Sequence, residues 1–307
     1  MTTVGVIGLG KMGLPIARNL LDRGFTVVGY RRTATDELDL AGGRIMSSPA
    51  DVASASDVLL SILPDTKALE DVVLSASGTL MGLRPGTVHI EMSTLDVEQK
   101  SRIRDRVVQA GGDLLDCPIS GTPAMVGPRA ATTFASGDPA SIQRVRPVLD
   151  AISGPWVIAG DFGAGAKLKY IAQLLVAVHT AATAEAMLLA QRSGLDLDLV
   201  QRTLNGSIAS STIWERRGPL MQTRQWTPAP GPIATLHLIL EQIDAHAADI
   251  SLTLPVFGAA KTLFDQALAH GWGDLDIAAV YDQLDGQVPD AAEASGGQES
   301  NTTGTPS

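Results

Sequence analysis

The chain has 307 residues, 45% of them hydrophobic and 18% charged, which is enough for two domains with substantial cores and is typical of a soluble globular protein. Its net charge of −10 argues against a nucleic-acid-binding or anionic-membrane surface, because such surfaces need a basic face. A single cysteine excludes an intrachain disulfide and a thiolate metal cluster, and it suits a cytoplasmic location.

Short apolar runs alternate with amphipathic segments in the first half of the chain. The runs are predicted as buried strands at residues 4–7, 26–30, 58–63, 88–92, 114–116, 132–135 and 156–159. The amphipathic segments are predicted as helices, among them residues 14–23, 49–55, 97–110 and one that starts near Pro139. Alternation of this kind is typical of a doubly wound parallel sheet. Strand-like sequence begins at Thr3, so no secretory signal is predicted.

The pattern changes beyond Gly165. Residues 167–193 contain no Gly or Pro and predict one long helix that ends at Gly194. Its apolar stretch resembles a membrane span, but polar residues within it favour a buried interdomain helix. The rest of the chain is helical in period to residue 285. We therefore predict an α/β domain at 1–161, an all-α domain at 162–285, and a disordered tail at 286–307.

The first predicted strand leads into the loop Gly8-Leu9-Gly10-Lys11-Met12-Gly13. In a Rossmann fold the first glycine allows a tight turn, the second lets the backbone approach a pyrophosphate, and the third lets helix and strand pack closely. The diphosphate lies on free amides at the helix N-terminus. A glycine-rich turn without a ligand is the alternative, but the strand–loop–helix context favours a dinucleotide.

The end of the second strand indicates which dinucleotide binds. An acidic residue there would bind the ribose 2′-hydroxyl of NAD, whereas this chain has Arg31, Arg32 and Thr33. Two guanidinium groups and a hydroxyl suit the 2′-phosphate of NADP. The alternative is that Arg31, Arg32 and Thr33 form a solvated basic turn that binds no phosphate. The sequence thus favours NADP (NADPH) over NAD.

Several motifs in order resemble the β-hydroxyacid dehydrogenases, which include 3-hydroxyisobutyrate dehydrogenase and have the imine reductases as relatives. The motifs are the glycine loop, Leu63-Pro64-Asp65, Met92-Ser93-Thr94, Asp116-Cys117-Pro118-Ile119-Ser120-Gly121, Gly163-Ala164-Gly165 with Lys169, and Gly273-Asp274-Leu275-Asp276. The resemblance covers residues 3–284. It implies a dinucleotide-binding Rossmann domain at 1–161, which a long helix joins to an all-α domain at 162–285 for substrate binding and dimerisation. The active site is expected between the two domains, and the C-terminal domain is expected to be of the 6-phosphogluconate dehydrogenase type.

The resemblance also implies roles for single residues. Lys169 matches the catalytic lysine, which donates or accepts the proton at the reacting oxygen. Lys167 lies two residues away and points elsewhere on the helix. The segment of Ser120, Gly121 and Thr122 is expected to hold a substrate carboxylate, with Ser120 also assisting catalysis. Further contacts to substrate or cofactor are expected from Thr94, Leu63 and Pro64. Ser93 and Thr94 could instead cap the helix that begins near residue 97.

The chain departs from the family pattern at three places. Asn is usual at the third and fourth positions after the catalytic lysine, where this chain has Ala172 and Gln173. Gln173 is expected to orient Lys169 through its amide. Thr122 and Pro123 follow the Ser-Gly pair where the family has a further glycine. A Lys-Asp pair of the later helix, whose lysine contacts the cofactor in the family, has no counterpart around residues 236–240.

Three functions remain open. The first is an NADP(H)-dependent oxidoreductase (EC 1.1.1 type) that transfers a hydride between nicotinamide and a small hydroxy acid or its semialdehyde or keto form. The second is a reductase of imines or larger carbonyl compounds, and the third is an NADPH-binding module without catalysis. The scattered histidines predict no metal site. We expect a small-molecule substrate, no nucleic acid, no membrane, and a homo-oligomer, with a dimer formed through the helical domain. Trp214, Trp226 and Trp272 line either a pocket or a dimer contact.

Overall fold

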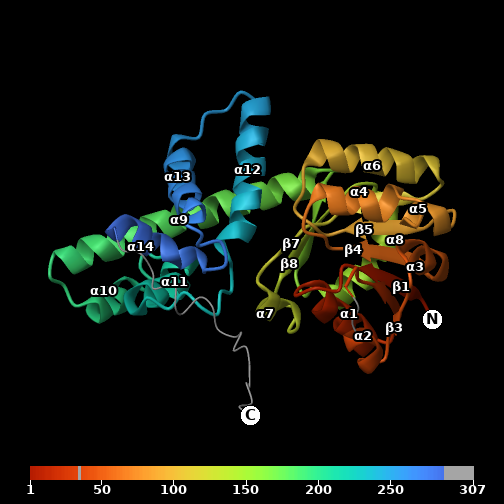
Figure 1. The fold of residues 1–307 in the computed structure, drawn as a ribbon, viewed down its shortest axis with the longest axis horizontal. Coiled ribbons are helices and arrows are strands. Elements are labelled where there is room, and N and C mark those ends of the chain that lie inside the picture. Colours follow the sequence, from red (N-terminus) through yellow and green to blue (C-terminus); the bar gives the residue numbers. More distant parts are fainter. Residues whose placement is uncertain (34–35, 287–307) are drawn as a thin grey trace, which may run out of the picture. The chain divides into compact units, whose positions relative to one another are not determined.

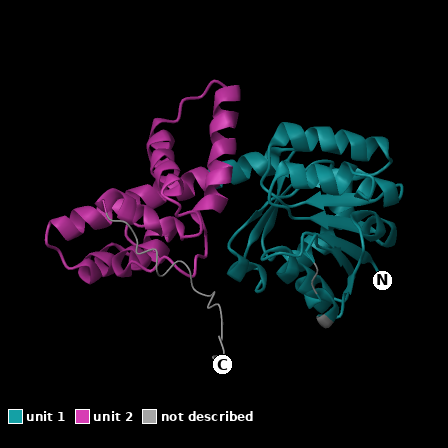
Figure 2. Ribbon diagram, viewed as in Figure 1, with its two compact units in different colours: residues 1–172 teal, residues 173–307 magenta. Residues whose placement is uncertain are grey.

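The computed structural model (Figure 1) describes residues 1–33 and 36–286. The chain divides into two compact units, residues 1–172 and 173–307 (Figure 2). They are an α/β unit and a helical unit, as the sequence predicts. The predicted disordered tail, apart from Gly286, lies outside the described residues.

The first unit contains all the strands of the described residues. They are β1 (Thr3–Ile7), β2 (Thr26–Tyr30), β3 (Arg44–Ile45), β4 (Val58–Ser61), β5 (Val88–Glu91), β6 (Asp113–Asp116), β7 (Ile119–Ser120), β8 (Thr132–Ser136) and β9 (Trp156–Gly160). Its helices are α1 (Gly13–Asp22), α2 (Glu37–Leu40), α3 (Pro49–Ala55), α4 (Thr66–Leu74), α5 (Thr79–Gly82), α6 (Val97–Gln109), α7 (Pro123–Val126), α8 (Pro139–Ile152) and the start of α9 (Ala164–Arg192).

One sheet runs through the unit in the order β3-β2-β1-β4-β5-β6-β8-β7, and β9 pairs with β8. The first six strands of this order are parallel, whereas β8 is antiparallel to β6 and β7. From β1 the chain adds β2 and β3 on one side, and it then adds β4, β5 and β6 on the other side. The loops that follow β1 and β4 therefore lead away in opposite directions from the carboxyl ends of these two strands. Open α/β sheets bind ligands at such a switch point.

Helices cover both faces of the sheet (Figure 1). Apolar side chains of α1 and α8 pack on one face, in a cluster that includes Val4, Val6 and Leu60. Ile7 and Leu59 belong to a different cluster with α3. Successive side chains of a strand point to opposite faces, so strands between two helical layers need apolar residues at every position. That requirement explains the continuous apolar runs in the sequence.

Side-chain caps determine where several helices begin. Asp65 accepts a hydrogen bond from the amide of Ala68 at the start of α4, at 2.7 Å, and Asp138 accepts one from Ser141 at the start of α8, at 2.8 Å. Asp96 caps α6 through the amide of Gln99, at 2.8 Å. The alternative that Ser93 or Thr94 caps α6 is therefore wrong, since the helix begins after Asp96.

The second unit consists of the rest of α9 with α10 (Leu197–Leu204), α11 (Thr212–Thr223), α12 (Ile233–Asp249), α13 (Pro255–Ala269), the 3-10 helix η1 (Ile277–Ala279) and α14 (Val280–Asp285). By length and composition α9 is apolar enough to cross a membrane, a test that core helices of soluble proteins also pass. An 18-residue apolar window of α9 is 39% buried, less than the buried helix that the sequence predicts. Several large apolar side chains of the helix are exposed, among them Ile171, Leu175 and Leu189.

The three tryptophans of the second unit belong to its interior. Trp214, Trp226 and Trp272 are each buried. The indole of Trp226 donates to Asp282 at 2.8 Å, and that of Trp214 donates to Asn205 at 3.1 Å. A buried indole needs such a partner. Within the described residues these side chains pack in the fold rather than line an open surface.

Candidate functional site

The loop from β1 to α1 needs two of its three glycines for its own packing. Gly8 has a φ of +97°, and a Cβ there would lie 2.1 Å from the carbonyl oxygen of Ile62. A Cβ at Gly13 would lie 1.9 Å from the carbonyl oxygen of Gly8. Side chains at these positions would collide with backbone, so the turn and the close packing of helix on strand depend on glycine.

Gly10 is different, because a Cβ built there meets no atom within 4 Å. The packing of the chain therefore gives no reason for glycine at this position, whereas close approach of a ligand to the backbone does. The first turn of α1 contains no acidic residue, and its capping position makes no side-chain hydrogen bond. Its amides thus face the loop with the partial positive charge of a helix N-terminus. The loop fits a pyrophosphate.

A cavity of about 490 Å³ lies at the carboxyl ends of β1, β2 and β4, and a smaller one of about 190 Å³ adjoins the glycine loop. Most of the predicted cofactor-binding residues line one or both. They are Gly8, Leu9, Gly10, Lys11, Met12, Gly13, Arg31, Arg32, Thr33, Leu63 and Pro64. Thr94, which was predicted with them, lines neither cavity.

The basic segment after β2 lies at the wall of the larger cavity. Arg31, Arg32 and Thr33 are exposed and follow Tyr30, the last residue of β2. The two guanidinium groups therefore stand beside a cavity that also contains the glycine loop. In a Rossmann fold, residues at this position bind the 2′-hydroxyl or the 2′-phosphate of the ribose and so distinguish NAD from NADP.

Sequence reasoning missed a further part of the lining of this cavity. It is formed by residues of α3, α4 and the segment after α4, namely Pro49, Ala68, Asp71, Val72, Ser75 and Ser77. None of them belongs to a recognisable motif. Only their position in the chain could have indicated that they line the cavity. They follow β3 and β4, and β4 lies next to β1, the strand that leads into the glycine loop.

Lys169 and Ser120 come together within the first unit. Lys169 lies in the second turn of α9, is 4% exposed, and donates to the hydroxyl of Ser120 at 3.2 Å. Burial lowers the pKa of Lys169 to about 8. Lys167, two residues earlier, is exposed. The structure thus separates two lysines that composition alone could not rank, and gives one of them the pKa of a group that can both donate and accept protons near neutrality.

Gly165 brings α9 close to the sheet. A Cβ at Gly165 would lie 2.4 Å from the carbonyl oxygen of Phe134 and 2.8 Å from that of Asp116. Gly163 has a φ of +90°. A Cβ at Gly163 would lie 2.5 Å from the side chain of Val97 in α6. Gly165 thus lets the first turn of α9 rest against β6 and β8, Gly163 lets the preceding turn approach α6, and Lys169 follows one turn later.

Two of the other predicted substrate-binding residues, Gly121 and Thr122, directly follow Ser120 in the chain. Gly121 is exposed, Thr122 is half-buried at the start of α7, and Thr94 is half-buried between β5 and α6. Gln173 follows Lys169 by one helical turn on α9, in the second unit. Its predicted role as an orienting residue stays a prediction, as does the position of the active site between the two domains.

In place of the Lys-Asp pair, residues 236–240 of α12 are Leu, His, Leu, Ile and Leu. Leu236, Ile239 and Leu240 are buried, His237 is half-buried and Leu238 is exposed. Most of this stretch therefore packs in the core.

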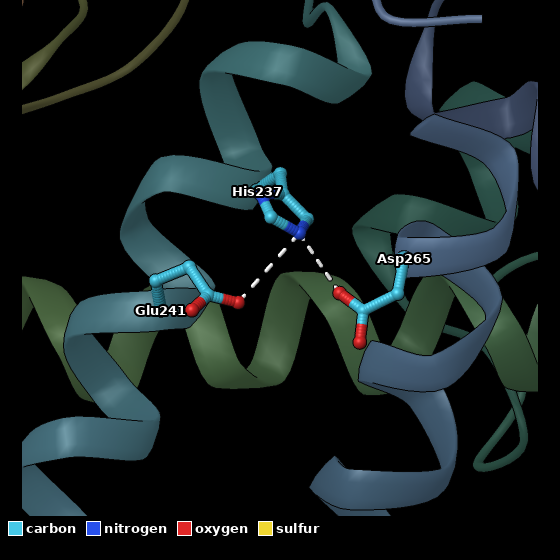
Figure 3. Close-up of side chains that lie close together, drawn as sticks. All are labelled: His237, Glu241 and Asp265. Atoms are coloured by element: carbon cyan, nitrogen blue, oxygen red, sulfur yellow. Dashed lines mark hydrogen bonds and ion pairs between the residues drawn. The ribbon is translucent and has the colours of Figure 1, made fainter. Parts of the chain in front are cut away.

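His237, Glu241 and Asp265 form a group that the histidine spacing did not predict (Figure 3). The imidazole Nε2 of His237 lies 2.8 Å from Asp265 Oδ1 and 3.6 Å from Glu241 Oε1. The ammonium of Lys261 lies 2.5 Å from Glu241 and 3.0 Å from both oxygens of Asp265. Because Lys261 already supplies a cation to both carboxylates, we interpret the group as an ion-pair network that ties α13 to α12.

Comparison with known proteins agrees with this architecture. Residues 3–160 match the family model of the NAD-binding domain of 6-phosphogluconate dehydrogenase. Residues 163–284 match the model described as NAD-binding of NADP-dependent 3-hydroxyisobutyrate dehydrogenase. The two models together cover both units.

Two curated relatives match over nearly their whole length. Glyoxylate/succinic semialdehyde reductase 1 of Arabidopsis thaliana is 30% identical over 92% of this chain and 98% of its own. L-threonate dehydrogenase of Cupriavidus necator is 32% identical over 94% and 99%. The crystal structure of 3-hydroxyisobutyrate dehydrogenase from Salmonella typhimurium has a TM-score of 0.83 and 28% identity, over 92% of this chain and 100% of that one. An imine reductase from Pseudomonas sp., with a TM-score of 0.56 and 21% identity over 92% and 99%, shares the fold. The chain belongs to the β-hydroxyacid dehydrogenase family.

Proposed function

We propose that this chain is an NADP(H)-dependent oxidoreductase that transfers a hydride between nicotinamide and a small hydroxy acid or its semialdehyde or keto form. One observation carries the proposal. A buried lysine, hydrogen-bonded to Ser120 at 3.2 Å, lies in the same unit as a glycine loop that fits a pyrophosphate. The bound nicotinamide would supply or accept the hydride, while the chain supplies the proton and the binding groups.

Lys169 has the properties that the proton transfer requires. During reduction a negative charge develops on the carbonyl oxygen, and a positioned ammonium both stabilises it and donates the proton. During oxidation the neutral amine accepts the hydroxyl proton. The Ser120 hydroxyl keeps the Lys169 side chain in one orientation at 3.2 Å. We propose that Ser120 also contacts the reacting oxygen and that the Gln173 amide orients Lys169.

The pKa of Lys169 predicts opposite pH dependences for the two directions. Burial lowers this pKa from 10.5 to about 8. Reduction needs the ammonium, so kcat should be level below pH 8 and fall about tenfold per pH unit above it. Oxidation needs the amine, so kcat should rise with pH and level off above 8. Steady-state rates from pH 6 to 10, in both directions at saturating cofactor, measure this. Flat profiles in both directions would contradict the role of Lys169.

A small carboxylate is the proposed substrate. The relatives' names include glyoxylate, succinic semialdehyde and L-threonate, each of which carries a carboxylate. We propose that the segment of Ser120, Gly121 and Thr122 holds this group with backbone amides and hydroxyls, and that Thr94 contributes from the loop after β5. Gly121 lies in a tight place, since a Cβ there would be 2.7 Å from the Cβ of Ala131. A larger residue would displace the segment.

NADP is the proposed cofactor because of the residues at the end of β2. Arg31, Arg32 and Thr33 line the cavity beside the glycine loop. In this segment the chain has no acidic residue to repel a 2′-phosphate. The two arginines also offset locally the net charge of −10, which would otherwise repel an anion.

Substitutions of two glycines should separate cofactor binding from folding. Gly10→Ala should leave the melting temperature unchanged, because the new methyl group meets no protein atom within 4 Å. It should weaken NADPH binding by about 5- to 150-fold, since a clash of this kind costs ~1–3 kcal/mol. Gly13→Ala, by contrast, should lower the melting temperature by several degrees, because its methyl group would lie 1.9 Å from a backbone oxygen. Fluorescence titration and thermal unfolding measure both. Unchanged NADPH affinity in Gly10→Ala would contradict the proposed cofactor position.

The test of the function is NADPH consumption with a panel of short-chain semialdehydes, keto acids and cyclic imines, with NADH as control. Turnover of carboxylate-bearing carbonyl compounds supports the proposal. Preferential turnover of imines would favour the second candidate, which the altered Thr122-Pro123 segment and the buried Leu236 motivate. NADPH binding without turnover of any compound would identify a non-catalytic module.

We also propose a homo-oligomer, with a dimer formed through the helical unit, and a cytoplasmic location. Large apolar side chains of this unit are exposed, among them Leu189, Leu195, Leu199 and Leu238. Exposed apolar surface of this kind supports association. The single, buried Cys117 suits a reducing compartment.

A further inference from the structure

Lys100 is a charged side chain that the proposed chemistry does not use, yet it is among the most buried in the protein. It lies on α6 with no exposed surface, and its ammonium contacts three groups. It lies 2.5 Å from Asp116 Oδ1, donates to the carbonyl oxygen of Ser93 at 2.9 Å, and forms an ion pair with Glu91 Oε2. Two of these contacts are hydrogen bonds, and the contact with Glu91 is an ion pair.

The electrostatics keep this ammonium charged. Desolvation by burial opposes the charge, but Asp116 and Glu91 together outweigh it and hold the pKa of Lys100 above its ordinary value. Burial raises the pKa of Glu91 above its ordinary value, although the ammonium of Lys100 and the hydrogen bonds from Lys100 and Ser93 oppose this shift. The Asp116 carboxylate accepts from an amide at the positive end of helix α9, which stabilises its negative charge.

The second oxygen of Asp116 binds the start of α9. Oδ2 accepts a hydrogen bond from the amide of Ala166 at 2.8 Å and one from the hydroxyl of Ser136 at 3.1 Å. The Ser136 hydroxyl in turn accepts from the amide of Gly165 at 3.0 Å. These two amides belong to the first turn of α9, and Lys169 follows three residues after Ala166, on the same side of the helix.

The other two partners of Lys100 bind the cofactor side of the unit. Glu91 Oε1 accepts a hydrogen bond from the amide of Ser93 at 2.9 Å. The hydroxyl of Ser93 accepts one from the amide of Leu63 at 2.7 Å, and Leu63 lines both cavities beside the glycine loop. The Lys100 ammonium is therefore connected to two parts of the unit. Through the Asp116 carboxylate it is linked to α9, the helix of Lys169, and through Ser93 it is linked to Leu63 in the wall of the cofactor cavity.

We propose that Lys100 is a positioning residue for hydride transfer, because through Asp116 and through Ser93 it fixes the first turn of α9 and the Leu63 loop relative to each other. This inference rests on the proposed function, since it assigns the proton transfer to Lys169. Buried ion pairs contribute little to stability compared with apolar residues of similar volume. Their defined geometry, by contrast, holds groups in place, and a shift of about 1 Å at a reacting centre costs up to about 10²-fold in rate.

The test compares Lys100→Met, the double variant Lys100→Met with Glu91→Gln, and a matched control. The double variant removes the Glu91 carboxyl group together with the ammonium, and the introduced glutamine side chain keeps a carbonyl acceptor for the Ser93 amide. It is expected to be more stable than Lys100→Met alone, because one buried carboxyl group loses its cation instead of two, and thermal unfolding of each variant checks this. Arg102→Met is the control, because Arg102 lies on the same helix but forms an exposed ion pair with Glu98 at 2.5 Å.

Three measurements distinguish positioning from a merely structural role. In the double variant, hydrogen exchange of the Gly165 and Ala166 amides should accelerate at least tenfold. The kcat per active site should fall about 10- to 100-fold, with KM for NADPH within about threefold. The deuterium isotope effect on kcat should rise, because the hydride step becomes limiting. Arg102→Met should match the wild type in all three.

The outcomes separate this inference from the proposed function. Faster exchange with a lower kcat and a larger isotope effect supports the positioning role. Faster exchange with unchanged kcat, isotope effect and pH profile overturns it, as does unchanged exchange. If the wild type reduces no substrate, the proposed function and the positioning role of Lys100 in catalysis both fail, whereas the exchange rates still show whether Lys100 holds the start of α9.

Discussion

Lys169→Ala is expected to lower kcat by about 10²–10⁴-fold while NADPH binds with unchanged affinity. General acid–base catalysis by a positioned side chain contributes about this factor. The buried ammonium, hydrogen-bonded to Ser120 at 3.2 Å, would be replaced by a methyl group that can neither donate a proton nor stabilise a developing alkoxide. Turnover and fluorescence titration of NADPH, measured on the same preparation, test both parts of this expectation.

Lys167 provides a matched control for Lys169. It carries the same charge on the same helix, two residues away, but its side chain is exposed. Lys167→Ala should therefore retain kcat within about twofold. A loss of activity equal to that of Lys169→Ala would show that general charge on α9, rather than one positioned ammonium, supports turnover. Full activity in Lys169→Ala would contradict the proposed mechanism.

The parallel strands could be predicted from sequence because each contains a short run of apolar residues between segments of helical period. Strands β1, β2, β4, β5 and β6 lie within two residues of their predicted limits. Strands β3 and β7 were missed, since each has two residues and so shows no periodicity. The cofactor loop was equally accessible, because its residues are contiguous and each glycine has a local reason.

The parts of the site that depend on distant contacts could not be predicted. On a helix with charged neighbours, Lys100 has the sequence of a solvated lysine, yet it is fully buried against two carboxylates from neighbouring strands. Likewise Ser75 and Ser77 become cavity residues only because the sheet order places α4 beside the glycine loop. Tertiary packing determines whether such residues are buried or line a cavity, and the local sequence pattern does not contain this information.

Loss of the two arginines after β2 should change the cofactor preference. Arg31→Ala with Arg32→Ala is expected to weaken NADPH binding about 10²-fold or more and to leave NADH binding within about twofold. A charge-assisted hydrogen bond is worth ~1.5–3 kcal/mol, and the lower end applies here because both side chains are exposed. Each lost bond at that end is about tenfold in affinity. Titrations with both cofactors measure the ratio.

A second pair of arginines separates local recognition from the overall field of an acidic protein. Arg23 and Arg102 are exposed in the same unit but line neither cavity. Their double replacement by alanine removes the same charge, so an equal loss of NADPH affinity there would mean that long-range attraction, not contact with the 2′-phosphate, accounts for the effect. Binding of NADH shows which phosphate group the two arginines contact. NADH lacks the 2′-phosphate but keeps the pyrophosphate, so a loss of NADH affinity in Arg31→Ala with Arg32→Ala would place the arginines at the diphosphate and refute the proposed basis for NADP preference.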